Sequence, residues 1–176
     1  MRVAPVHIML CCLLAAGSAA AGGRMDLVVF PDGYQEDFTR YLTTNRANGK
    51  AQMVHIYAND GALHSADETQ PLGQGAILVM EIYKAEENAE GNALKAADGT
   101  YKPGKLAAIA VMEKRDWGHR YPAVDRSGHW GFGFYDGAGQ PKPNDLDCAG
   151  CHNPLTEHDY LFSWSALKDF ARNRGD

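Results

Sequence analysis

Short apolar runs, rich in β-branched and aromatic residues, recur along this chain and are separated by residues that favour turns. This pattern is typical of β-strands joined by loops. It predicts five strands, at Leu27–Phe30, Met53–Ala58, Ala76–Tyr83, Leu106–Glu113 and Trp130–Tyr135. Turns are predicted at Asn59-Asp60-Gly61, Asp136-Gly137 and Pro141-Lys142-Pro143. The polar segment Glu86–Gly104, rich in glycine and alanine, predicts a long exposed loop or hairpin tip.

Two segments have the spacing of short amphipathic helices, Tyr34–Thr44 and Ser163–Arg172, the second with Ser163 as its N-cap. The sequence therefore predicts an α+β, β-rich fold with an antiparallel sheet and short flanking helices. A chain of 176 residues suits one domain.

Two of the predicted strands carry further information. Ala76–Tyr83 is apolar on both faces apart from Glu81, which predicts a strand in the middle of a sheet, covered on both sides. In the last strand Trp130, Phe132 and Phe134 share one face. They form either an aromatic wall for a large flat group or part of the core.

The first residues have the pattern of a secretory signal: Arg2, an apolar run over residues 6–16, and small residues up to Ala21. The run is too short to cross a bilayer unaided. We expect cleavage near Ala21, so residues 1–21 are a signal peptide and residues 22–176 form a single domain. This predicts a periplasmic protein with no membrane segment after cleavage.

Charge and cysteine count narrow the chemistry. The net charge is −5 with no basic block, which argues against nucleic acid as a partner. Cys11 and Cys12 would leave with the signal, so only Cys148 and Cys151 remain. Two thiols three positions apart cannot staple distant segments and need a local chemical reason.

Cys148-Ala149-Gly150-Cys151-His152 is the pattern of covalent haem attachment. Each thiol adds across a haem vinyl group, giving two thioethers, and the adjacent imidazole binds the iron. Asn144 or Asp145 is the predicted cap of this short helix. The sequence thus predicts one haem c per chain at a C-terminal site, with His152 as the metal ligand.

Two alternatives fit less well. A redox Cys-x-x-Cys normally lies early in a chain, after a strand in a βαβ pattern. A structural zinc site needs a second pair of ligands, and the remaining histidines are scattered singly: His55, His64, His119, His129 and His158.

No methionine follows His152. A sulfur ligand on the opposite side of the iron would therefore have to come from earlier in the chain. The candidates are Met25, Met53, Met80 and Met112.

Several segments occur in the order found in one known family. They are His55–Asp60, Gly75–Val79, Val111–Lys114, Gly128–Phe132, the haem motif and Asp159–Phe162. Together they resemble the cytochrome P-460 and cytochrome c′-β family. The resemblance implies a β-rich fold, a homodimer, and a five-coordinate haem bound by the motif histidine.

The resemblance also implies a division at one position. Cytochromes P-460 oxidise hydroxylamine and carry a haem crosslinked to a lysine, whereas cytochromes c′-β lack that lysine and bind nitric oxide or carbon monoxide. Met80 stands at the lysine position, so the chain is similar to the c′-β kind. Lys84 and Lys50 are the candidates for a replacement crosslink. Lys84 lies four residues beyond Met80 on the same strand, a distance of about 13 Å, so only a bulge or a register shift would bring it to the same edge of the haem.

The functional prediction is a monohaem protein that binds small gases, with Met80 among the cofactor-binding residues. A hydroxylamine-oxidising enzyme with a crosslinked haem is the second candidate. The third is an electron carrier with Met80 as sixth ligand and a redox partner protein. Met80 is thus an apolar lid, an iron ligand or core packing.

Three further residues are weaker candidates for the site. His129 flanks the aromatic wall. Arg120 and Arg126 are candidates for neutralising haem propionates, since a guanidinium suits carboxylates.

Overall fold

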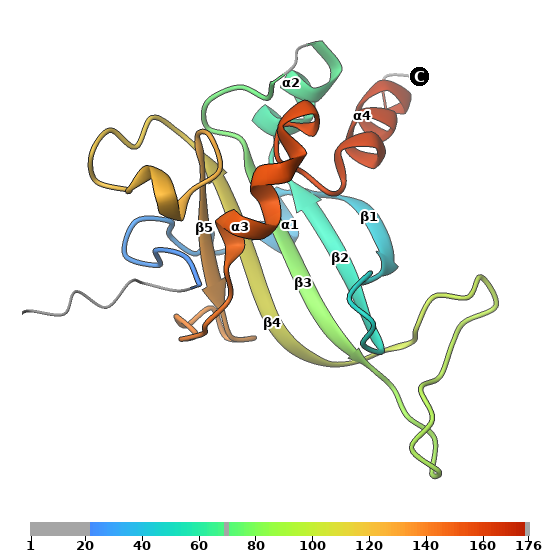
Figure 1. Ribbon diagram of the computed structural model, residues 1–176. Coiled ribbons are helices and arrows are strands. Elements are labelled where there is room, and N and C mark those ends of the chain that lie inside the picture. The colour runs from blue at the N-terminus through green and yellow to red at the C-terminus, as the bar shows by residue number, and fades with distance from the viewer. Residues whose placement is uncertain (1–21, 69–70, 175–176) are drawn as a thin grey trace, which may run out of the picture.

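The computed structural model describes residues 22–68 and 71–174, and the predicted signal peptide lies outside them. Five antiparallel strands form one sheet in the order β1-β2-β3-β4-β5 (Figure 1). They are β1 (Thr39–Asn45), β2 (Gln52–Ala58), β3 (Ile77–Ala85), β4 (Pro103–Lys114) and β5 (Trp130–Tyr135). The predicted α+β, β-rich fold with an antiparallel sheet is confirmed.

Strand β3 lies at the centre of the sheet, as predicted from its apolar faces. Met80 pairs with Ile56 of β2 and with Ala110 of β4. Cross-strand partners share a face, so the even-numbered residues of β2–β5 lie on one side of the sheet up to a register shift after Ile82. We call this side the even face and the opposite side the odd face. Beyond that shift Leu106 pairs with Tyr83 and lies on the odd face.

The predicted strand Leu27–Phe30 is wrong, because this segment forms a turn that leads into extended coil. The amides of Leu27 and Val28 both donate to the carbonyl of Arg24, at 2.9 and 2.8 Å. Val28 is nevertheless fully buried against the odd face. The apolar composition of the segment therefore reflects packing onto the sheet rather than membership of it.

The predicted helix Tyr34–Thr44 is correct only for its first turn, α1 (Tyr34–Asp37), and the rest forms edge strand β1. Threonine favours strands because its branched side chain fits the pleat, and three threonines lie in β1. Pairing with β2 also buries Tyr41 beneath the helices. Tertiary pairing thus overrides the helical spacing.

The predicted turn at Asn59-Asp60-Gly61 is also wrong, since helix α2 (Asp60–Glu68) begins there. Asn59 Oδ1 accepts hydrogen bonds from the amides of Ala62 at 3.0 Å and Ile77 at 3.1 Å. Asparagine is a good N-cap because its side chain satisfies a free amide of the first turn. The same side chain ties the start of α2 to the start of β3.

The C-terminal part contains α3 (Cys148–His152), a 3₁₀ segment (Asn153–His158) and α4 (Trp164–Asn173); another 3₁₀ turn covers Ala123–Asp125. The predicted helix Ser163–Arg172 is confirmed within one residue. Ser163 occupies the N-cap but makes no side-chain cap, because its Oγ pairs with the Tyr41 hydroxyl at 2.7 Å. The predicted hairpin tip between β3 and β4 is confirmed by two isolated bridges.

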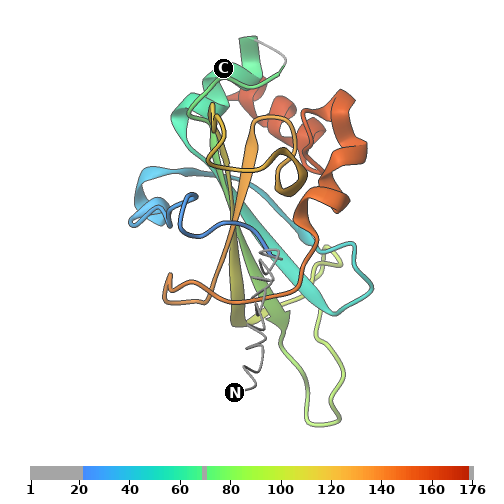
Figure 2. The ribbon, with the colours of Figure 1, turned by 60° about the vertical axis from the view of Figure 1, so that its left-hand side comes forward.

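The two faces of the sheet are covered differently (Figure 2). Helices α2 and α4 cover one end of the even face, where Leu63, Leu78 and Leu167 are buried together. The N-terminal segment and the loop after β4 cover the odd face. In the described residues no helix is long and apolar enough to cross a membrane.

Candidate functional site

The cysteine-histidine motif forms helix α3, which lies across the even face near β5 (Figure 1). Asp147 Oδ1 accepts a hydrogen bond from the Gly150 amide at 2.7 Å and caps the helix. The predicted caps Asn144 and Asp145 are wrong, because an N-cap directly precedes the first helical residue. Asn144 instead donates to the carbonyl of Lys142 at 3.0 Å.

Cys148 and Cys151 are both free thiols. Cys148 is half-buried, and Cys151 is exposed. Burial, reinforced by the charges of Cys151 and Asp147, raises the pKa of the Cys148 thiol to about 11. Cys148 is therefore a protonated thiol at neutral pH, presented one helical turn from a second thiol.

The imidazole of His152 is oriented by the backbone carbonyl of Tyr160, 2.6 Å from its Nδ1. A carbonyl only accepts hydrogen bonds, so Nδ1 carries the proton and Nε2 keeps its lone pair for a metal. Burial lowers the pKa of His152, and the Tyr160 carbonyl partly offsets this effect. The neutral form, which binds metals, is thus favoured.

Aromatic rings on two sides hold the same imidazole. The ring centres of Phe132, on β5, and Phe162, before α4, each lie 5.1 Å from that of His152. Phe162 is 72% exposed and Leu146, just before the motif, is 42% exposed. Phe162 thus exposes a ring that also packs on His152, which fits contact with an apolar group at this place.

A row of half-buried apolar residues crosses the even face beyond the helices. Its members are paired in register across four strands: Ile56, Met80, Ala110 and Phe134. Phe134 is two residues from Phe132, so the row lies beside the ring that packs on His152. These thiols, this imidazole and this flat apolar surface fit a haem macrocycle.

The other sequence candidates lie outside this arrangement. Lys84 is exposed on the even face and pairs with Gln52, and Lys50 is exposed in the β1–β2 turn. His129 is exposed, as is Arg120. Arg126 instead donates from Nε to the Tyr121 carbonyl at 3.2 Å and stabilises its own loop.

The predicted aromatic wall is divided between two roles. Trp130 is fully buried in the core under the helices, whereas Phe132 and Phe134 lie near the motif. The sequence did not indicate Lys142, which lies near Phe134. Lys142 Nζ lies 5.9 Å from the Phe134 ring centre and donates to the Ala107 carbonyl at 2.7 Å. Its only sequence signal was a position between two prolines, which indicated no more than a turn.

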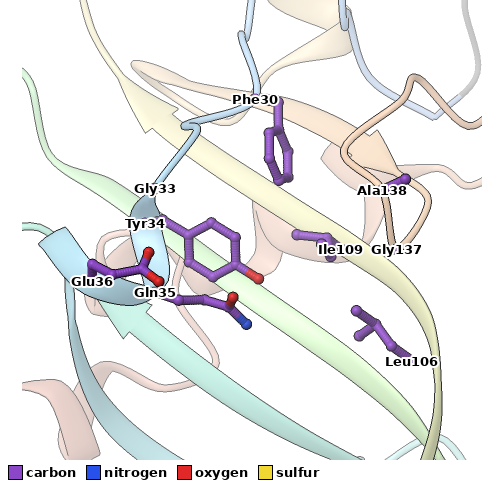
Figure 3. Close-up of a pocket in the computed structure, with 9 residues that line it drawn as sticks. All are labelled: Phe30, Gly33, Tyr34, Gln35, Glu36, Leu106, Ile109, Gly137 and Ala138. Atoms are coloured by element: carbon purple, nitrogen blue, oxygen red, sulfur yellow. The ribbon is translucent and has the colours of Figure 1, made fainter.

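A hollow lies on the odd face of the sheet (Figure 3). It is a pocket of about 230 Å³ between α1 and the turn after β5. The labelled side chains that line it include Phe30, Tyr34, Gln35, Leu106 and Ile109. Because β3 and β4 separate it from the cysteines, it is distinct from the candidate haem site.

Comparison with known protein families gives a match over most of the chain. The family model of Cytochrome P460 matches residues 31–163, from just before α1 to just before α4. The match includes the sheet, the motif and Tyr160. Comparison with curated proteins gives no match. Because the family match spans more than half of the 176 residues, the chain belongs to the cytochrome P460 family, whose cofactor is a haem.

Proposed function

We propose that this chain is a periplasmic c-type monohaem protein that binds nitric oxide and carbon monoxide at a five-coordinate iron. Cys148 and Cys151 hold the haem through two thioethers, and Nε2 of His152 is the protein ligand. The observation that carries the proposal is the 2.6 Å contact between His152 Nδ1 and the Tyr160 carbonyl. It leaves Nε2 free beside two thiols and an apolar surface.

The residues around the site support ligand binding. The haem supplies an iron with one open position when only one protein ligand is present. The half-buried row on the even face offers hydrocarbon and one thioether, from Met80. Such a lining excludes water and ions while it admits small neutral molecules, since burying an unpaired charge is costly.

The c′-β character of the site is part of the proposal. By the family resemblance Met80 takes the position of the crosslinking lysine. Lys84 and Lys50 are both exposed, which supports the absence of a replacement crosslink. In this reading Met80 is an apolar lid over the open side of the haem. Its half-buried place beside Ile82 and Phe134 supports this role.

A second candidate function is hydroxylamine oxidation with a lysine-crosslinked haem. The partly buried amine of Lys142, near the Phe134 ring, favours it. The third candidate is an electron carrier in which Met80 closes the iron and a redox protein is the partner. The place of the Met80 thioether in the row beside Phe134 favours that alternative.

The test is the absorption spectrum of the full chain, matured in a bacterial host that attaches haem c, before and after reduction and addition of carbon monoxide. We expect high-spin iron in both oxidation states and a new reduced band with carbon monoxide. The intact mass should equal the cleaved chain plus one haem. Low-spin iron in both states would contradict the gas-binding proposal in favour of the carrier. A red-shifted reduced band and a haem peptide containing a lysine would favour the crosslinked enzyme.

Met80→Ala separates the roles of this side chain. If Met80 is a lid, the variant should bind carbon monoxide several-fold faster, because the row opens. If it is a ligand, the same change should convert low-spin iron to high-spin. Met53→Ala is the matched control, since Met53 is buried in the sheet and faces away from Met80.

We also propose that the protein is a homodimer and that residues 1–21 are removed on export. Light scattering on the purified haem protein tests the first statement. N-terminal sequencing of periplasmic protein tests the second, and a mature chain that starts far from residue 22 would contradict it.

A further inference from the structure

A buried ion pair joins the end of the central sheet to the segment that follows the motif. Lys114 Nζ lies 2.6 and 2.7 Å from the two carboxylate oxygens of Asp159. Their side chains are only 4% and 3% exposed. Asp159 Oδ2 also accepts from the amide of Leu72 at 2.9 Å. Both charges are therefore compensated in a dry environment, where each would be costly alone.

The Lys114 end of this pair is rigid. The backbone of Lys114 donates to the Ala76 carbonyl at 2.9 Å and accepts from the Gly75 amide at 2.7 Å. Its ammonium also lies 5.4 Å from the ring centre of Trp130, a fully buried residue. The position of Asp159 is thus determined by strand β4.

The Asp159 end lies in a left-handed turn of the backbone. Asp159 and Tyr160 have φ values of 47° and 63°, and among described residues they are the only non-glycine residues with positive φ. Two consecutive left-handed residues are unfavourable and persist only where the surroundings hold them. This reversal directs the Tyr160 carbonyl to His152 Nδ1.

We propose that the Lys114–Asp159 pair is a positioning device for the iron ligand. It holds the left-handed turn, the turn holds the Tyr160 carbonyl, and the carbonyl sets how strongly His152 Nδ1–H is bonded. A stronger bond at Nδ1 makes Nε2 more basic and favours ferric over ferrous iron. This inference rests on the proposed function, because it requires His152 to bind the haem iron.

The competing explanation is that the pair only fastens the C-terminal segment to the sheet. Both explanations predict a less stable protein when the pair is broken. Only the positioning role predicts a change in the iron–histidine bond itself. Loss of the Asp159 charge shifts the redox potential through space under either explanation, so the deciding readout is the iron–histidine stretching band.

The main variant is Asp159→Asn, measured as the haem protein by resonance Raman spectroscopy and redox titration. Asparagine tolerates a left-handed backbone and still accepts from the Leu72 amide. The variant therefore keeps that contact but breaks the ion pair and leaves the buried Lys114 ammonium without its counter-charge. We expect a lower iron–histidine stretching frequency in the ferrous state. We also expect about a tenfold loss of preference for ferric iron, which is a rise of about 59 mV in potential for a one-electron couple.

Two further variants make the test specific. Lys114→Arg retains the charge and should keep both readouts close to those of the unaltered protein. Glu81→Gln is the matched control, because it disturbs a fully buried carboxylate on the odd face, away from Tyr160. It should lower stability without moving the iron–histidine band.

An unchanged iron–histidine band in Asp159→Asn would overturn the positioning role, whatever happens to the stability or the potential. If that variant does not accumulate, the double variant Lys114→Met/Asp159→Asn replaces it, since removing both buried charges is often tolerated. The iron–histidine band of the double variant then decides in the same way. The spectrum of the unaltered protein is recorded first, because absence of haem there would refute the proposed function as well. If the unaltered protein carries haem and the variants leave its iron–histidine band unchanged, only the positioning role is refuted.

Discussion

Glu81→Gln is the change whose effect on stability the structure defines best. Glu81 is a fully buried carboxylate on the odd face of the central strand. Its Oε1 accepts from the hydroxyl of Tyr34 at 2.6 Å and from the side-chain amide (Nε2) of Gln35 at 2.5 Å. Its Oε2 accepts from the hydroxyls of Tyr57 at 3.2 Å and Tyr83 at 3.0 Å. The carboxylate therefore connects α1 to the sheet.

The magnitude follows from these bonds. A hydrogen bond to a charged group contributes about 1 kcal/mol more than a neutral one, so the four bonds to Glu81 lose roughly 4 kcal/mol of charge assistance. The neutral amide of glutamine costs less to bury than a carboxylate, which offsets part of this loss in the free energy of unfolding. We expect a net loss of about 2–3 kcal/mol in the free energy of unfolding, a large share of the ~5–15 kcal/mol of a typical domain.

The assay is equilibrium unfolding in urea, followed by circular dichroism on the haem protein. Tyr83→Phe is the companion variant, because it removes one donor and leaves the charge, and it should cost less than Glu81→Gln. A Glu81→Gln protein as stable as the unaltered one would refute the reasoning. It would mean that the cost of burying the carboxylate cancels the gain from its four donors.

Three further predictions follow from single features. Cys148→Ser or Cys151→Ser should leave one thioether, giving a shifted pyridine haemochrome band, and the double variant should release its haem in acidic organic solvent. Asn59→Ala removes the cap of α2 and should cost about 1–2 kcal/mol in urea unfolding; an unchanged midpoint would contradict the capping role. Burial raises the pKa of Tyr121 and Tyr135 to about 12, so phenolate is disfavoured in the folded state. The stability that these two neutral phenols contribute is therefore complete below the ordinary pKa of 10 and is lost between pH 10 and 12. Ultraviolet titration should show that both ionise above pH 10, together with unfolding. Ionisation of both at the ordinary pKa of 10 would contradict this prediction.

Much of the sheet could be predicted from local pattern alone. Four of the strands were located from β-branched and aromatic runs, and Trp130–Tyr135 was correct at both ends. The central place of β3 also followed from residues that are apolar on both faces. These features are local, because alternation and burial on a strand are imposed at every second residue.

The errors have a common cause. Leu27–Phe30 is apolar because it packs on the odd face, and an apolar run does not distinguish packing from pairing. Tyr34–Thr44 has helical spacing, yet most of it becomes strand because the exposed edge of β2 offers a partner. Asn59-Asp60-Gly61 favours a turn and a helix start equally, and the contacts of Asn59 with Ile77 decide for the helix.

The amino-acid sequence by itself predicted the chemistry of this protein: two thiols one helical turn apart and an adjacent imidazole. Adjacent residues carry that chemistry, so no folding is needed to recognise it. Tertiary structure alone decided how the imidazole is held. Tyr160 faces His152, and Lys114 reaches Asp159 across 45 positions of the chain, only because the C-terminal segment packs on the end of β4. Such contacts depend on which surfaces are buried together, and no local pattern records that choice.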